Sequence, residues 1–211
     1  MDLFKYTAHE LHEKLVNKEI TAVELTNAVY DRIAAVDEQV NAYISLSKEE
    51  ALAKAAEVDA KIAAGEAIAP LAGIPVVFKD NINIYGQVTS CASKMLQGVE
   101  TVFDAHVTEE LRKEDAVFLG KANMAEFSIG NTTDNSYNGA AHNPWNLNCT
   151  TGGCATAAAV AAGEAVWALA SDTSGDLRQP AAYAGCVGIK PTYGRVSRLG
   201  LAAYASSMDQ I

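Results

Sequence analysis

From residue 70 onward, short apolar runs rich in β-branched residues alternate with segments of helical spacing. The runs that predict buried strands are GIPVVFKDN (73–81), AVFLGKAN (116–123), VWALAS (166–171) and CVGIKPTYG (186–194). Helices are expected between these strands, from a cap at Asp104 to about Lys113 and over ATAAAVAAG (155–163). This alternation predicts an α/β fold with a mixed sheet that helices cover on both faces.

The first 65 residues instead predict three helices, near 7–17, 21–36 and 47–64. Each follows a capping box, in which a Ser or Thr and a Glu three residues later satisfy free backbone N–H groups; the boxes begin at Thr7, Thr21 and Ser47. Gly65 is expected to end the third helix. We therefore expect one domain over residues 1–211, in which a helical layer (1–65) joins an α/β core (70–211).

Charge and cysteine content restrict the partners that we expect. The net charge of −10 opposes binding to a phosphate backbone, so no direct contact with nucleic acid is expected. Cys149 and Cys154 are the only neighbouring cysteines, and their spacing is a poor zinc pattern, so we expect neither a metal nor another cofactor. The apolar run 157–170 is too short to cross a membrane, and the N-terminus lacks a signal-peptide pattern. We expect a cytoplasmic protein with no membrane contact.

Two features suggest chemistry, and each has a plain alternative. Lys79 ends the strand 73–81; an apolar setting would lower its pKa and make it a base, whereas most lysines are exposed or paired. Gly152 and Gly153 precede a helix and free backbone N–H groups for an anion, although a tight turn explains them equally well. The residues alone leave both readings open.

Several longer stretches carry a resemblance to a known family. They include LAGIPVVFKDNI (71–82), GKANMAEFSIGNTTDNSYNG (120–139), SDTSGDLRQPAAYAGCVGIKPTYGRVSRLGL (171–201) and SSMDQI (206–211). With these stretches the chain resembles the amidase signature family and, within it, the A subunits of the tRNA-dependent amidotransferases. The resemblance covers essentially the whole chain but only about half of the family's usual length, so we expect a truncated form of that fold.

The resemblance implies a serine–cis-serine–lysine triad, of which this sequence keeps one member. The lysine maps to Lys79, whereas the nucleophilic serine maps to Asp176. The cis-serine loop, TTGGCATAAAV, is two residues shorter than the family pattern, so its serine position falls on Cys154 or on Gly152, depending on the direction of counting. Neither register supplies a serine.

The resemblance also places an oxyanion hole before the nucleophile position. Its positions map to Thr173, Ser174 and Gly175, with Ser174 in place of a glycine; Gly152 and Gly153 complete the expected substrate-binding set. A carboxylate at 176 is a weak nucleophile toward amides and opposes a developing oxyanion. We therefore predict a structural ion pair between Lys79 and Asp176.

These substitutions leave three functional hypotheses. The first is an impaired or inactive member of the family that acts in binding or assembly. The second is an active amide hydrolase or glutamine-dependent amidotransferase component that uses Cys154 or Ser174 as its nucleophile; Cys154 lies at an expected helix N-terminus, whose dipole lowers the pKa of a thiol. The third is a decaying fragment without a role.

A half-length sheet also predicts a partner. Half of a sheet would leave an apolar edge and face uncovered. A homodimer is the simplest cover, and a second chain that supplies the missing half is the alternative. Partner subunits of an amidotransferase are further candidates.

Overall fold

The structure is a computed structural model, and it describes residues 2–211. Its α-helices are α1 (Ala8–Val16), α2 (Ala22–Val40), α3 (Lys48–Ala63), α4 (His106–Lys113), α5 (Thr156–Ala162) and α6 (Arg178–Ala184). Its strands are β1 (Tyr43–Leu46), β2 (Pro75–Lys79), β3 (Val117–Ala122), β4 (His142–Asn143), β5 (Asn146–Thr150) and β6 (Trp167–Leu169). Three short 3₁₀ helices, η1 (Leu3–Lys5), η2 (Lys94–Leu96) and η3 (Glu126–Ser128), complete the elements.

The predicted α/β architecture with a mixed sheet is confirmed. The central sheet has the strand order β1-β3-β2-β6, and β4 pairs with β5 in a separate hairpin. Strands β3, β2 and β6 run parallel, whereas β1 runs antiparallel to β3. Both β2 and β3 are buried along their whole length, as their continuous apolar runs predict.

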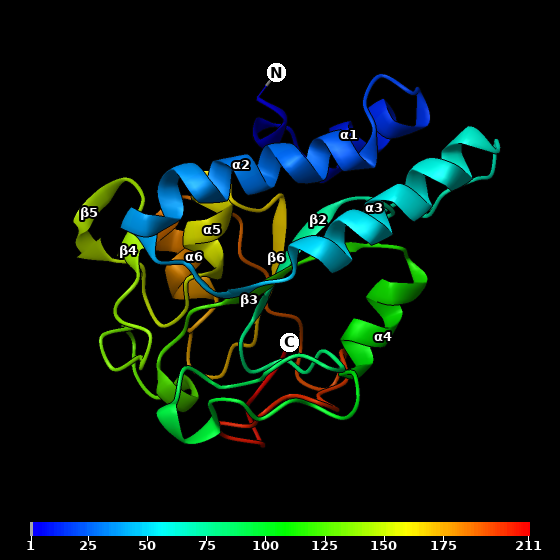
Figure 1. Ribbon diagram of the computed structural model, residues 1–211. Helices are drawn as coiled ribbons and strands as arrows, with labels where there is room; N and C mark the ends of the chain where they lie inside the picture. The colour runs from blue at the N-terminus through cyan, green and yellow to red at the C-terminus, as the bar shows by residue number, and fades with distance from the viewer. Residues whose placement is uncertain (1) are drawn as a thin grey trace.

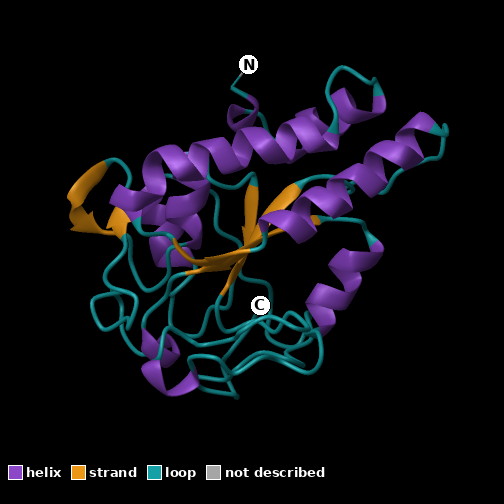
Figure 2. Ribbon diagram, in the orientation of Figure 1, coloured by secondary structure: helices purple, strands orange, loops and turns teal. Residues whose placement is uncertain are grey.

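Helices and loops cover the two faces of this sheet differently. One core lies between the sheet and helices α1, α2, α3 and α5, with Leu11, Leu25, Val58 and Ala158 among its buried residues. On the other face, α4 and the loops near Val196 pack against a smaller core. Figure 1 shows α1 to α3 on one side of the strands and α4 with the C-terminal loops on the other, and Figure 2 shows how much of that second side is loop.

The N-terminal helices form where their capping boxes predict them, with one exception. Thr7 and Thr21 each accept a hydrogen bond from the backbone N–H of the glutamate three residues later, and that glutamate accepts from the threonine N–H in return. The prediction of a capping box at the start of α3 is wrong, because the Ser47 side chain does not cap the helix. Its hydroxyl instead accepts a hydrogen bond from the Gln87 side chain. Gly65 does follow the end of α3, with a positive φ of 78°.

Two further sequence predictions are wrong. Asp104 does not cap α4: its carboxylate accepts hydrogen bonds from Tyr85 N–H and from the Arg112 side chain, which draw it away from the helix end. The segment 186–194 is not a strand. Val187 and Ile189 are 90% and 75% exposed. Among the described residues no strand lies beyond β6 to pair with this segment.

Gly120 in β3 is the position where the sheet depends most on a glycine. It has a φ of +149°, and a Cβ built there lies 2.1 Å from the carbonyl oxygen of Ser45 in the paired strand β1. We expect Gly120→Ala to lower the free energy of unfolding by about 3 kcal/mol or more, because β1 must separate from β3. Gly86→Ala is the matched control: its φ is +75° and its Cβ meets nothing within 4 Å. Chemical denaturation of both variants measures the difference, and equal losses would contradict this role of Gly120.

Candidate functional site

The site forms at the carboxyl end of the parallel strands. Lys79 is the last residue of β2, and the loop that carries Asp176 follows β6, the neighbouring parallel strand. The Lys79 Nζ lies 2.5 Å from Asp176 Oδ2, and the two side chains are 0% and 3% exposed. The predicted Lys79–Asp176 ion pair is therefore confirmed. The alternative of an exposed lysine at this position is wrong.

Ser171 and Asn81 complete the surroundings of the lysine. The Lys79 ammonium donates to the Ser171 hydroxyl at 3.0 Å and to the Ser171 carbonyl oxygen at 3.3 Å. Asn81 donates to the same hydroxyl at 2.9 Å. Sequence reasoning missed both residues, although each lies in a stretch that carries the family resemblance and is two positions from a predicted site residue, Asn81 from Lys79 and Ser171 from Thr173.

The second carboxylate oxygen of Asp176 occupies a predicted oxyanion-hole position. The backbone N–H of Thr173 donates to Asp176 Oδ1 at 2.8 Å. The N–H of Gly175 donates to a different carboxylate, Asp172 Oδ1, at 2.9 Å. Ser174, between them, is exposed. Two of the three expected N–H donors are thus already bound to carboxylates of the chain itself.

Asp172 fixes the loop that presents Asp176. It is fully buried and pairs with the Arg178 side chain at 2.8 Å. Although burial acts to raise the pKa of Asp172, the hydrogen bonds from Arg178 and Gly175 outweigh it and hold that pKa below its usual value. The backbone of Asp172 also exchanges hydrogen bonds with that of Gln210. The loop 171–178 is therefore clamped between α6 and the last residues of the chain.

Cys154 touches the site but does not have the properties of a nucleophile. Its Sγ donates to the Asp176 carbonyl oxygen at 2.9 Å and lies 3.1 Å from the Thr156 hydroxyl. The side chain is fully buried, and burial raises the pKa of the thiol. The expectation that a helix N-terminus lowers this pKa is wrong, because the loss of water outweighs the other contacts.

The two glycines before Cys154 are needed for close packing. A Cβ at Gly152 would lie 2.8 Å from Pro180 Cγ on α6, and a Cβ at Gly153 would lie 3.1 Å from Asp176 Cβ. The cis-serine position of the family maps to Cys154 or to Gly152. Of these two residues only Cys154 has a side chain, and that side chain contacts residue 176. The tight-turn reading of the glycines fits this geometry.

A second buried lysine–aspartate pair, which sequence reasoning also missed, lies in the neighbouring loops. Lys121 Nζ is 3.8 Å from Asp80 Oδ1, and both side chains are buried. The lysine donates to the Ile82 carbonyl oxygen and to the Thr89 hydroxyl. Burial lowers the pKa of Lys121 to about 8. The lone lysine in the apolar run 116–123 was the available signal.

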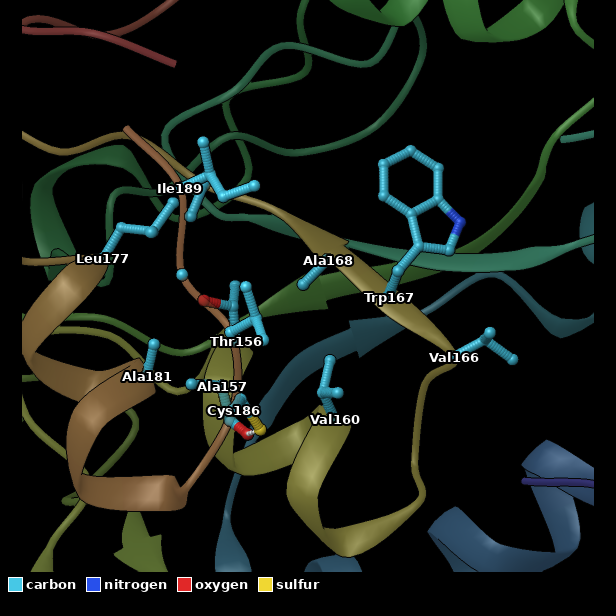
Figure 3. Close-up of a pocket in the computed structure, with 13 residues that line it drawn as sticks. Thr156, Ala157, Val160, Val166, Trp167, Ala168, Leu177, Ala181, Cys186 and Ile189 are labelled. Carbon is cyan, nitrogen blue, oxygen red and sulfur yellow. Dashed lines mark hydrogen bonds between the residues drawn. The ribbon is translucent and has the colours of Figure 1, made fainter. Parts of the chain in front are cut away.

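A cavity of about 440 Å³ lies beside the site, along the free edge of β6. Figure 3 shows Trp167, Ala168, Thr156 and Ile189 around it, on β6, α5 and the segment after α6. Its lining is mainly apolar, and neither Lys79 nor Asp176 contributes to it. The cavity and the ion pair are therefore separate features.

The described part of the chain holds neither a metal cluster nor a membrane-spanning helix. Residues 2–211 contain no group of three or more His, Cys, Asp or Glu side chains placed to hold a metal ion. No helix in the same range has the length and apolar character to cross a membrane.

Comparison with known proteins identifies the relatives of this chain. Residues 24–211 match the Amidase family. The glutamyl-tRNA(Gln) amidotransferase A subunit of Desulforamulus reducens is 54% identical over the whole chain, and the protein of that name from Clostridium botulinum strain Kyoto is 51% identical. The predicted similarity to amidotransferase A subunits is confirmed. Each match covers 44% of the relative, so this chain spans less than half of the length of the curated relatives.

Solved structures agree with these sequence matches. The glutamyl-tRNA(Gln) amidotransferase A subunit from Thermotoga maritima superposes with a TM-score of 0.83 at 40% identity, covering 100% of this chain and 43% of the other. Peptide amidase from Stenotrophomonas maltophilia superposes with a TM-score of 0.91 at 36% identity, covering 97% and 44%. The sequence match, the fold and the mixed sheet agree, and the chain belongs to the amidase family.

Proposed function

We propose that this chain is a catalytically impaired member of the amidase family that acts by binding or assembly. One observation carries the proposal: the Asp176 carboxylate binds Lys79 with one oxygen and the Thr173 N–H with the other. A carboxylate in this position occupies two groups that hydrolysis of an amide would require, a free amine base and an oxyanion donor.

The physical reasons for impaired catalysis add to one another. Lys79 Nζ donates hydrogen bonds to the Asp176 carboxylate and to two oxygens of Ser171, so these contacts hold it away from the role of a free base. Asp176 itself is a weak nucleophile toward an amide and has no hydroxyl proton to relay. Its negative charge also opposes the oxyanion of a tetrahedral intermediate. The chain is left with a buried ion pair where the family places its triad.

The alternative nucleophiles have little support from the geometry. The Cys154 thiol is buried, its pKa is raised, and its Sγ donates to a backbone oxygen. The Ser174 side chain is exposed, and no hydrogen bond links it to Lys79. Either residue would need the loop 171–178 to rearrange before it could attack an amide.

Ammonia release tests this proposal. We expect no release above a heat-inactivated control when the purified protein is given glutamine, asparagine or simple primary amides. Asp176→Ser restores a hydroxyl but not the relay serine, so we expect it to stay far below an active relative such as peptide amidase. Ammonia release by the unmodified chain would contradict the proposal, and loss of that activity in Cys154→Ala or Ser174→Ala would then name the nucleophile.

We also propose a partner for the free edge of β6. The edge is lined by an apolar cavity, and the adjacent Val187 and Ile189 are almost fully exposed. The curated relatives have more than half of their length beyond what this chain matches. A polypeptide equivalent to that remaining part would add strands to β6 and cover the apolar residues.

A binding experiment with matched variants tests the partner. We expect the chain to form a one-to-one complex with a polypeptide that corresponds to the remaining part of the Desulforamulus reducens relative, as measured by size-exclusion chromatography with light scattering. Val187→Glu should abolish the complex, whereas Val102→Glu, at a site that is 81% exposed, should not. A stable homodimer that Val187→Glu dissociates, or no complex at all, would overturn the proposed occupant.

A further inference from the structure

We propose that Lys79 and Asp176 condense to an intramolecular amide bond with release of one water molecule. The amine nitrogen lies 2.5 Å from a carboxylate oxygen, and both side chains are buried. β2 and the loop after β6 hold the two groups together, so the condensation needs no diffusion of reactants. This modification goes beyond the proposed function and acts on the same two side chains, because condensation would replace the Lys79–Asp176 ion pair by a covalent bond.

The direct contact between Nζ and Oδ2 supplies the path for the protons. One proton passes from Nζ to Oδ2 through their contact, which gives a neutral amine and a carboxylic acid. The Nζ lone pair then attacks the Asp176 carboxyl carbon, and the negative charge develops on Oδ1, to which the Thr173 N–H donates at 2.8 Å. A second proton then passes directly from Nζ to Oδ2, the two atoms that the ion pair already holds in contact. The C–Oδ2 bond breaks, water leaves, and the third proton stays on the amide nitrogen.

Burial favours the product of this reaction. Holding two charges in a site from which water is excluded is unfavourable, and their mutual attraction offsets that cost only in part. The amide and the released water carry no net charge, so condensation removes that cost. The Ser171 carbonyl oxygen, 3.3 Å from Nζ, remains as an acceptor for the amide N–H. Position 176 has no hydroxyl that could attack an amide, but its carboxylate and the Lys79 amine are the two groups from which an amide forms.

The second buried pair provides an internal control. Lys121 and Asp80 are also buried, but their closest atoms are 3.8 Å apart. The other oxygen of Asp80 accepts hydrogen bonds from the Ser90 hydroxyl and from the N–H groups of Ser90 and Ala92. The Lys121 ammonium donates instead to Ile82 and Thr89. We expect no condensation at this pair.

Mass spectrometry of the purified protein tests the inference. We expect the folded chain to lose the mass of one water molecule on incubation. Tandem mass spectrometry of a tryptic digest should find a branched peptide that joins Lys79 to Asp176, with no cleavage after Lys79 and normal cleavage after Lys121. Lys79→Arg keeps a positive charge but supplies no amine to condense, so it should retain its full mass.

The unmodified chain decides the outcome by itself, even if a variant fails to fold. A wild-type protein that unfolds cooperatively, keeps its full mass after prolonged incubation and is cleaved after Lys79 would overturn the inference. A water loss that maps to another residue would overturn it equally. Neither result would bear on ammonia release, so the failure of this inference is distinguishable from the failure of the proposed function.

Discussion

Replacing Lys79 by methionine lowers the free energy of unfolding by about 3–5 kcal/mol, the usual cost of leaving one member of a buried ion pair without its partner. The Asp176 carboxylate is 3% exposed and would keep only its hydrogen bond from Thr173 N–H. The Ser171 hydroxyl would also lose the hydrogen bond from the ammonium and keep only the one from Asn81. Urea denaturation followed by circular dichroism measures the loss.

A surface lysine provides the control for this experiment. Lys18 is exposed, so Lys18→Met should change the free energy of unfolding by less than about 0.5 kcal/mol. If Lys79→Met behaved like Lys18→Met, the buried pair would contribute nothing to the fold. That result would contradict the structural role that we assign to it.

The stability of the chain falls by about 3–6 kcal/mol between pH 5 and pH 9 through one buried glutamate, because each unit of pKa shift corresponds to about 1.4 kcal/mol. Glu164 follows α5, is fully buried, and lies next to the Asp37 carboxyl group. Burial, together with the charge of Asp37, raises the pKa of Glu164 from 4.5 to about 9. The folded chain therefore holds a proton that the unfolded chain releases, and this contribution is complete below pH 4.5 and lost as the pH rises to 9.

Glu164→Gln separates this effect from other titrations. Glutamine imitates the protonated acid, so the variant should lose most of the decline between pH 5 and pH 9 and be more stable than wild type at pH 8. Glu66→Gln, at an exposed position, should leave the decline unchanged. Parallel pH profiles for wild type and Glu164→Gln would show that this carboxyl is not the group responsible.

Local signals predicted most of the fold. Two of the three capping boxes form, and the continuous apolar runs at 73–81 and 116–123 became the two fully buried strands. The failures occur where the outcome depends on distant contacts. Ser47 binds Gln87 instead of its own helix, and Asp104 binds Tyr85 and Arg112. These hydrogen-bond partners lie outside the short sequence windows from which the caps were predicted.

Short elements escaped prediction for a related reason. Strand β1 has four residues and pairs with β3 across more than seventy positions, and α6 has seven residues, including Pro180. Each is stabilised by its neighbours in space more than by its own propensity. The segment 186–194 shows the reverse case: its strand-like pattern stays largely exposed, because no strand within residues 2–211 pairs with it.

The centre of the site was predicted more fully than its surroundings. The family motifs place Lys79 and Asp176 at the ends of adjacent parallel strands, so their contact follows from the topology. The hydroxyl of Ser171, the Thr173 N–H on Asp176 and the burial of Cys154 depend on the path of the loops. Side-chain burial at that level is set by three-dimensional packing, which a motif does not encode.

A structural ion pair between Lys79 and Asp176, at positions where the family resemblance places catalytic residues, predicts strong energetic coupling between the two side chains, which a double-mutant cycle measures. Lys79→Met, Asp176→Ala and the double variant are compared with freshly purified wild type of full mass, in which the pair is not condensed, by urea denaturation. We predict a coupling energy of about 2–3 kcal/mol, with the double variant more stable than the sum of the two single losses allows, because neither charge is left buried alone. Additive losses, with a coupling energy below about 0.5 kcal/mol, would contradict a structural ion pair between Lys79 and Asp176.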